Sequence, residues 1–179
     1  VLSRKEAKNH EIDFYPYKRL TLRALGEDGD ISADELEEFR ASELLDDAWL
    51  TVVGSVVVRL FSPMCPVLID ESNQGLLVPS QLAMLRVKDR RVILPQYLRL
   101  CLAQKGLQEH VAKMEQGTAQ RTVKIGTIMD LQITVPDLET QYKAAEIDAL
   151  NRKRKRMYRD LVEQEQLLTD RMIKNIISP

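Results

Sequence analysis

The strongest constraint in the sequence is a run of 40 residues, Leu138 to Ile177, that contains neither glycine nor proline. Both residues interrupt helices, glycine through its backbone entropy and proline through its missing N–H group and its ring. The run therefore predicts one uninterrupted C-terminal helix of about 60 Å. Residues 1–137 remain for a globular domain, and a domain of that length can bury a core of ordinary size.

The predicted helix carries an apolar stripe with nearly heptad spacing. Arg154, Gln164 and Arg171 interrupt it, and polar residues in such a seam can set the register of a coiled coil. Residues 1–137 are too few to cover the whole stripe, so we expect a helix of another chain, or of a missing part of this one, to pack on it. The residues expected at this dimer or partner interface are Ile147, Leu150, Met157, Leu161, Leu168, Met172 and Ile176.

Residues 1–137 alternate short apolar stretches with Gly, Pro, Asn and Asp, which is typical of a mixed fold. Strands are expected within 14–25 and at 56–60, 67–69, 76–78, 81–87, 122–124 and 132–135. Helices are expected at 32–39 with Ser32 as N-cap, at 96–103 after Pro95, and at 107–114 after a break at Gly106 and up to Gly117, with a helical turn at 128–131. The expected fold class is α+β: a mixed, curled β-sheet domain (1–137) and one long C-terminal helix (138–179) that forms a coiled coil.

A net charge of −1 conceals an uneven distribution of charge along the chain. Residues 27–47 hold ten acids and one base, whereas residues 86–124 hold nine bases and three acids. The second region is the one that a polyanion would meet. Residues 141–179 hold nine bases and six acids, five of the bases being consecutive at 152–156. Five bases in a row point all around a helix, so this run is expected to face solvent or another subunit.

Signals of catalysis, metal binding and membrane insertion are missing from the sequence. It contains no G-x-x-x-x-G-K-[ST], G-x-G-x-x-G, G-x-S-x-G or H-E-x-x-H motif, and His10 and His110 are isolated. Cys65 and Cys101 stand 36 residues apart and form no disulfide framework or zinc-ligand spacing. No 18-residue apolar run and no apolar leader occur. We expect a non-catalytic, cytoplasmic protein without metal or cofactor.

The sequence Pro136-Asp137-Leu138-Glu139 resembles the first half of a nuclease metal site. The second half needs an acid two residues before a lysine, and Gln141 occupies that position before Lys143. Without the second acid, the carboxylates are poorly placed to hold Mg²⁺. The sequence instead predicts that Asp137 caps the N-terminus of the long helix.

Three segments in a fixed order resemble the target recognition domain of type I restriction–modification specificity subunits. The first is Val53-Gly54-Ser55-Val56 through Leu60, followed by a hairpin from Gly75 to Arg86, and the second is Leu94-Pro95-Gln96-Tyr97-Leu98-Arg99. The third, which is the most specific, is Gly117-Thr118-Ala119-Gln120 followed by Leu131-Gln132-Ile133-Thr134-Val135-Pro136-Asp137-Leu138-Glu139-Thr140-Gln141. Ser55 departs from the family's "G-D" pair, and residues before 50 match only loosely.

The resemblance implies a subunit that reads DNA but performs no chemistry itself. Full-length members carry two recognition domains and two spacer helices, and this chain has one of each. It therefore implies a half-subunit, a split gene product or a truncated relative that pairs through its helix as a homodimer. Its further partners would be double-stranded DNA, an adenine methyltransferase subunit and, beyond that, a restriction/translocase subunit.

Basic, amide and hydroxyl side chains within 80–124 are the expected DNA contacts. Lysine and arginine neutralise phosphates, while arginine and glutamine can also pair with base edges in the major groove. The residues expected near DNA are Ser80, Gln81, Arg86, Arg90, Arg91, Lys105, Gln116, Thr118, Gln120, Arg121 and Lys124.

Two other interpretations fit the sequence. A coiled-coil adaptor without DNA specificity could use the acidic segment 27–47 to dock a protein. The chain could also be the C-terminal recognition part of a fused restriction–methylation enzyme. Affinity for DNA that falls steeply with salt would separate the DNA-reading interpretation from the adaptor.

Overall fold

In the computed structural model, residues 5–6, 14–115 and 122–177 are described. They form a mixed α+β arrangement with two compact units, residues 1–145 and residues 146–179. No helix in these described ranges combines the length and the apolarity that crossing a bilayer requires.

The centre of the first unit is a three-stranded antiparallel sheet in the order β4-β3-β5. Its strands are β3 (Val56–Arg59), β4 (Val67–Leu68) and β5 (Leu82–Leu85). Because successive side chains of a strand point to opposite faces, Val56 and Val58 join one core cluster and Val57 joins another. The run of β-branched residues in β3 is therefore buried on both faces of this sheet.

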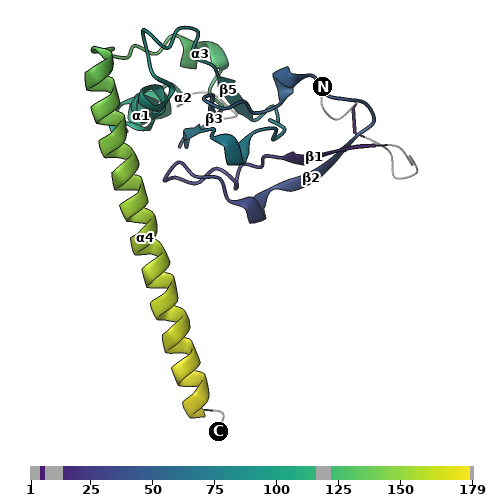
Figure 1. The fold of residues 1–179 in the computed structure, drawn as a ribbon, viewed down its shortest axis with the longest axis vertical. Helices are drawn as coiled ribbons and strands as arrows, with labels where there is room; N and C mark the ends of the chain where they lie inside the picture. Colours follow the sequence, from purple (N-terminus) through teal and green to yellow (C-terminus); the bar gives the residue numbers. More distant parts are fainter. Residues whose placement is uncertain (1–4, 7–13, 116–121, 178–179) are drawn as a thin grey trace. The chain divides into compact units, whose positions relative to one another are not determined.

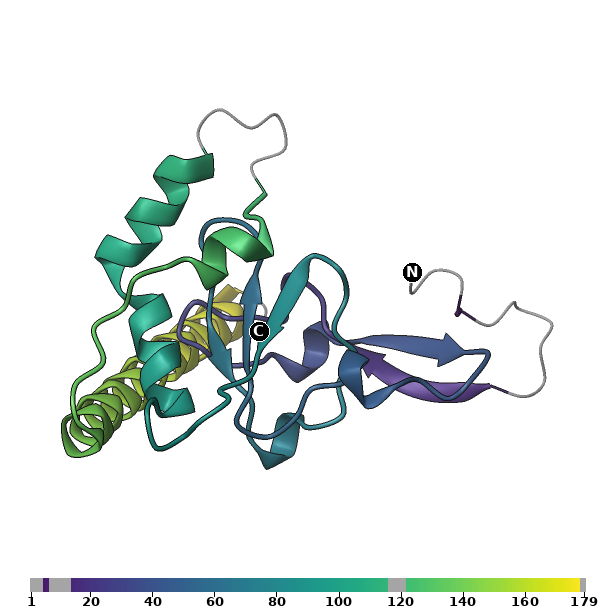
Figure 2. The ribbon, with the colours of Figure 1, turned by 90° about the horizontal axis from the view of Figure 1, so that it is seen from above.

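A second, two-stranded antiparallel sheet is formed by β1 (Tyr15–Arg19) and β2 (Glu37–Ala41). Tyr17 lies opposite Phe39 in its register, and both pack in a third core cluster with Trp49 and Leu77. Figures 1 and 2 show the two-stranded sheet on one side of the three-stranded sheet and the short helices on the other side. The first unit therefore places small sheets and helices around several small cores.

Three short helices follow β5 along the chain: α1 (Pro95–Ala103), α2 (Lys105–Glu115) and α3 (Ile125–Met129). Pro95 stands in the first turn of α1, where no helical partner for its missing N–H is needed. Leu102 of α1, Val111 of α2 and Ile128 of α3 are buried in the cluster that contains Val56 and Val58. The helices thus cover one face of the three-stranded sheet.

The long helix is confirmed as α4, which runs without interruption from Leu138 to Ile177 (Figure 1). Asp137 caps its N-terminus as expected: Oδ1 accepts from the Thr140 backbone N–H at 2.9 Å, and Oδ2 accepts from the Thr140 hydroxyl at 2.7 Å. These bonds satisfy one of the backbone donors that the first turn leaves without a helical partner.

Gln141 holds the first turn of α4 to the globular unit. Its side chain is fully buried. Oε1 accepts from the Leu94 backbone N–H at 2.9 Å, while Nε2 donates to the carbonyls of Val92 at 2.9 Å and Pro136 at 2.8 Å. One side chain thus satisfies three backbone groups, two of which belong to the segment that leads into α1.

The prediction of a helix at 32–39 is wrong. Only a 3-10 turn, Ala33–Glu35, forms there, and Ser32 makes no side-chain cap. Residues 37–41 are instead strand β2, because pairing with β1 buries Phe39 at 1% exposure and Ala41 at 0%. Burial of these two side chains against a partner strand outweighs the local helix signal.

The predictions of strands at 122–124 and 132–135 are also wrong. Val123 makes one backbone hydrogen bond, to the Leu60 carbonyl at 2.8 Å, before α3 begins at Ile125. Residues 132–135 belong to no strand, and the Tyr97 hydroxyl donates to the Thr134 carbonyl at 2.9 Å. An extended segment needs a neighbouring strand to become part of a sheet, and neither segment has one.

Smaller differences concern the ends of elements. Segment 76–78 takes part through single bridges, Leu77 with Arg19 and Leu77 with Leu50, and does not form a full strand. The break between α1 and α2 lies at Gln104, so Gly106 stands inside α2. The helical turn expected at 128–131 begins earlier, as α3. The helix end expected at Gly117 lies outside the described residues.

Replacing Gln141 with leucine should destabilise the first unit. The change leaves the Leu94 N–H and the Val92 and Pro136 carbonyls without their partner, and each buried unsatisfied group costs about 1–3 kcal/mol. Urea unfolding of the full chain should show a loss of about 3 kcal/mol or more. The matched change Gln166→Leu, at an exposed position of α4, should leave the free energy of unfolding nearly unchanged; an equal loss in both variants would contradict the role of Gln141.

Stability should fall in acid partly through Asp137. Hydrogen bonds from the Thr140 hydroxyl and backbone lower the pKa of this carboxyl. A carboxyl whose pKa is lower in the folded than in the unfolded chain stabilises the fold when the pH is above its pKa in the unfolded chain. That stabilisation is lost as the pH falls through its pKa in the folded chain. Melting temperatures measured from pH 6 to pH 3 should fall more for the native chain than for Asp137→Asn, which keeps a capping oxygen but does not titrate. Identical pH profiles would rule out this contribution.

Candidate nucleic-acid interface

The residues expected near DNA are spread over several segments of the first unit. Ser80 and Gln81 precede β5, Arg86 follows it, and Arg90 and Arg91 stand in the loop that leads to α1. Lys105 begins α2, and Lys124 is the N-cap residue of α3. All seven are exposed. The remaining four, Gln116, Thr118, Gln120 and Arg121, lie outside the described residues.

Two of these cations are already engaged by carboxylates. Arg91 donates from Nε and Nη2 to the two oxygens of Asp89 at 3.0 and 2.9 Å. This pairing lowers the pKa of Asp89 through the hydrogen bonds from Arg91. Lys105 lies 3.7 Å from Glu109, one turn further along α2. Both pairs are on the surface, where an ion pair contributes little and a phosphate can compete for the cation.

Two other arginines are held by the backbone around them. The Arg86 Nη2 donates to the Asp47 carbonyl at 3.2 Å. The Arg90 guanidinium lies against Gly54, whose φ is +83°, and a Cβ atom at that position would collide with the guanidinium. The loop between β5 and α1 is thus tied to the turn that precedes β3, and the exposed guanidinium groups keep donors available to a ligand.

Gln81 lies on the wall of an open cleft of about 470 Å³. The other walls are the turn after β1 and the segment that leads into β2. The cleft is lined by Arg19, Leu20, Thr21, Leu22, Arg23, Asp34, Glu35, Leu36, Glu37, Pro79 and Gln81. Guanidinium, amide and carboxylate groups together are the side chains that pair with base edges. The cleft therefore contains hydrogen-bonding side chains beyond those predicted from the sequence.

The two arginines of this cleft are functional candidates that the sequence reasoning missed. Arg19 pairs with Glu37 at 2.6 Å, across the β1–β2 register, while the Arg23 side chain is exposed. The available signal was segment 14–25, which has three bases and no acid. The sequence alone does not place these bases in a cleft, because the cleft forms only when β1 pairs with β2, a strand from the acidic segment.

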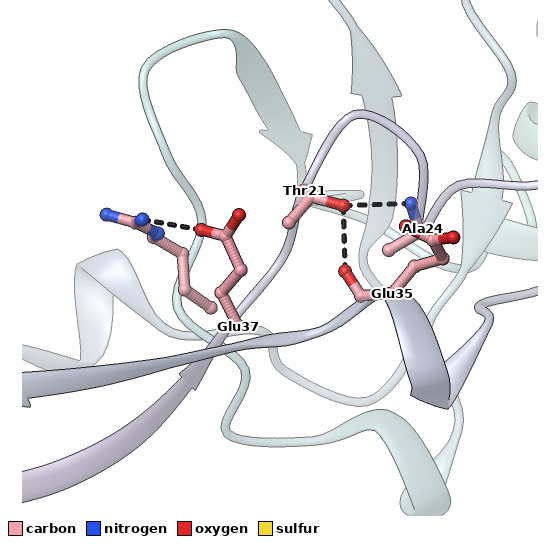
Figure 3. A network of polar contacts seen from close by, with 5 residues as sticks. Thr21, Ala24, Glu35 and Glu37 are labelled. Carbon is pink, nitrogen blue, oxygen red and sulfur yellow. Dashed lines mark hydrogen bonds and ion pairs between the residues drawn. The ribbon is translucent and has the colours of Figure 1, made fainter.

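Thr21 joins two of the segments that line the cleft, and Figure 3 shows its contacts. The Thr21 hydroxyl donates to the Glu35 carbonyl at 2.8 Å and accepts from the Ala24 backbone N–H at 3.1 Å. One side chain thereby fixes the turn after β1 against the segment before β2. The two walls that carry Arg23 and Glu37 are held in place by this contact.

A second cleft of about 620 Å³ lies between α2 and the region of α3. It is lined by Gly106, Leu107, His110, Met114, Thr127, Asp130, Leu131 and Gln132. Exposed Lys105 begins α2, and exposed Lys124 is the N-cap residue of α3. These two of the cations expected near DNA therefore adjoin elements that line a different cleft from the one that contains Gln81.

The described ranges contain no candidate metal centre. No group of three or more His, Cys, Asp or Glu side chains within those ranges could hold a metal ion. Burial raises the pKa of Cys101 and of Cys65, so both side chains are protonated thiols at neutral pH.

Comparisons with known proteins point to one kind of structure. No family model matches the sequence, and no curated protein sequence does. The HsdS subunit from Thermoanaerobacter tengcongensis matches with a TM-score of 0.65 and 19% identity, over 90% of this chain and 42% of that one. A structure described as showing complex assembly and conformational transition of the type I R-M system matches with a TM-score of 0.68 and 18% identity, over 92% of this chain and 43% of that one.

The chain thus spans about two fifths of the length of each matching chain. At these identities the similarity establishes the fold, and it includes most of the residues of this chain. The chain has the fold of part of a type I restriction–modification specificity subunit.

Proposed function

We propose that this chain is a non-catalytic DNA-recognition subunit of a type I restriction–modification complex. The observation that carries the proposal is the similarity of fold to an HsdS subunit over 90% of the chain. Residues 1–137 would be the target recognition domain, and residues 138–179 the spacer and dimerisation helix. Because one domain can read only one stretch of duplex, each copy would recognise one half of a bipartite site.

The base-reading groups would come from the cleft that contains Gln81. A glutamine amide donates to and accepts from the edge of adenine, and an arginine guanidinium can donate twice to guanine. Gln81 and Arg23 lie on two walls of this cleft, and the Thr21 contact holds the turn that carries Arg23 against the segment before β2. Arg86, Arg90 and Lys124 would contact phosphates, because their exposed charges fit a contact that sets position rather than sequence.

The long helix would provide the contacts with other subunits. Its apolar stripe is uncovered along the second unit: Leu150, Met157, Leu161 and Leu168 are 52–62% exposed. An apolar stripe of this length is typical of a surface that another helix covers. We propose that two copies pair through these helices as a homodimer, and that the pair docks an adenine methyltransferase subunit and, through it, a restriction/translocase subunit.

Binding to duplex DNA should weaken steeply as the salt concentration rises. Each phosphate contact adds about one unit to the slope of log affinity against log salt. Arg90→Ala and Lys124→Ala should each lower that slope by about one, measured by fluorescence anisotropy of the full chain with labelled duplex. Lys174→Ala, in the last turn of α4, should leave the slope unchanged. Absence of DNA binding even at low salt would favour the adaptor interpretation.

The homodimer should dissociate when a charge enters the stripe. Leu161→Asp places a carboxylate among apolar side chains, where an unpaired charge is costly. Sedimentation equilibrium should show a dimer for the native chain and a monomer for this variant. Leu167→Asp is the matched control, because Leu167 is similarly exposed, at 63%, but lies on the opposite face of α4. A native chain that is monomeric at all concentrations would contradict the proposed pairing.

A further inference from the structure

Arg19 and Glu37 form a donor–acceptor unit on the wall of the cleft that contains Gln81. The Arg19 Nη2 donates to Glu37 Oε2 at 2.6 Å, and the two residues lie opposite each other in the β1–β2 register. The guanidinium also lies over the ring of Phe39, with 5.5 Å from Cζ to the ring centroid, and Phe39 is 1% exposed. A carboxylate and a buried ring therefore hold the guanidinium, so it loses little freedom when it binds a ligand.

Both side chains keep hydrogen-bonding capacity for a ligand. A guanidinium has several N–H donors, and within the described ranges the Arg19 side chain uses only the bond to Glu37. The second carboxylate oxygen of Glu37, Oε1, has no hydrogen-bond partner among the described residues. The side chains of Arg19 and Glu37 are 32% and 55% exposed. The cleft wall therefore presents unused N–H donors beside an unused carboxylate oxygen.

The charges of the cleft argue against a phosphate as its ligand. Its lining holds two bases, Arg19 and Arg23, and three acids, Asp34, Glu35 and Glu37. The carboxylates would repel a phosphate, and an ionised phosphate offers no donor for Glu37 to accept from. The edge of a base pair carries donors as well as acceptors and has no net charge. The cleft is therefore suited to the edge of a base pair rather than to the DNA backbone.

The order of donors and acceptors selects one kind of base pair. In the major groove, a G·C pair presents N7 and O6 of guanine as neighbouring acceptors, followed by the N4 amino donor of cytosine. The N–H groups of Arg19 match the neighbouring acceptors, and Glu37 Oε1 matches the amino donor. An A·T pair instead places the N6 donor of adenine between two acceptors and adds the thymine methyl group. The unit therefore matches G·C and leaves unpaired groups on A·T.

We propose that Arg19 and Glu37 read one G·C base pair from the major groove, Arg19 at guanine N7 and O6 and Glu37 at cytosine N4. This inference rests on the proposed DNA-recognition function and adds the base pair that the cleft selects and the residues that select it. Pairing of β1 with β2 sets the spacing of the two side chains, because it places residues 18 positions apart directly opposite each other. The acidic segment 27–47 then has a role, because it supplies the acceptor for cytosine.

The first test changes the DNA and leaves the chain native. Duplexes that the full chain selects from a random-sequence pool are remade with 7-deazaguanine, which lacks N7, or with N4-methylcytosine, whose methyl group replaces the amino hydrogen in the major groove. At one G·C position, each analogue should raise the dissociation constant about fivefold or more, because a base contact of this kind is lost. Unchanged affinity at every G·C position would overturn the inference.

The second test assigns each contact to its residue. Arg19→Met, which keeps an apolar stem on Phe39, should no longer respond to 7-deazaguanine and should bind G·C and A·T at this position within about threefold. Glu37→Ala should no longer respond to N4-methylcytosine. A surface ion pair adds little stability, so both variants should fold. Lys18→Met and Glu38→Ala are the matched controls, because this adjacent register pair points to the opposite face of the two-stranded sheet and should keep both responses.

The outcomes separate this inference from the proposed function. A chain that selects a DNA sequence, but responds to both analogues equally in the native form, Arg19→Met and Glu37→Ala, would overturn the reading role of this pair and leave DNA recognition intact. A native chain that selects no sequence, even at low salt, would overturn both. Loss of one analogue response in each variant, with both responses kept in the two controls, would establish the inference.

Discussion

Gln141 is the residue on which the start of the long helix depends. The helix can form from its own sequence, but its first turn would have no defined place on the first unit if it merely followed a flexible segment. Gln141 is fully buried and bonds to backbone groups of Val92, Leu94 and Pro136. Together with the Asp137 cap, it fixes the first turn of α4 on the globular unit.

This anchor links the first turn of α4 to the elements of the first unit. Leu94 immediately precedes α1, so the bond from its N–H to Gln141 links the start of α4 to the start of α1. α1 in turn packs on β3 and β4 in the central sheet. The proposed function requires this continuity, because a helix can set the distance between two recognition domains only if each domain is fixed to its end of the helix.

The sequence predicted those elements that depend on residues close together in the chain. The Gly- and Pro-free run gave α4 with its ends at Leu138 and Ile177, Asp137 gave its cap, and Pro95 gave the start of α1. Strand β2 could not be predicted in this way, because Phe39 is buried only through pairing with β1. The cleft around Gln81 was missed for the same reason: Arg19 and Glu37 are 18 residues apart and meet only across that pairing. The resemblance in sequence to specificity subunits supplied the fold that composition alone could not.

The central claim is that a two-fold pair of these chains reads a divided DNA site. The most direct measurement is selection of tightly bound duplexes from a random-sequence pool by the full chain, followed by sequencing. The account predicts enrichment of one half-site, present twice in inverted orientation and separated by a single constant gap. Duplexes that carry only one undivided site, or a pool without any enriched sequence, would contradict it.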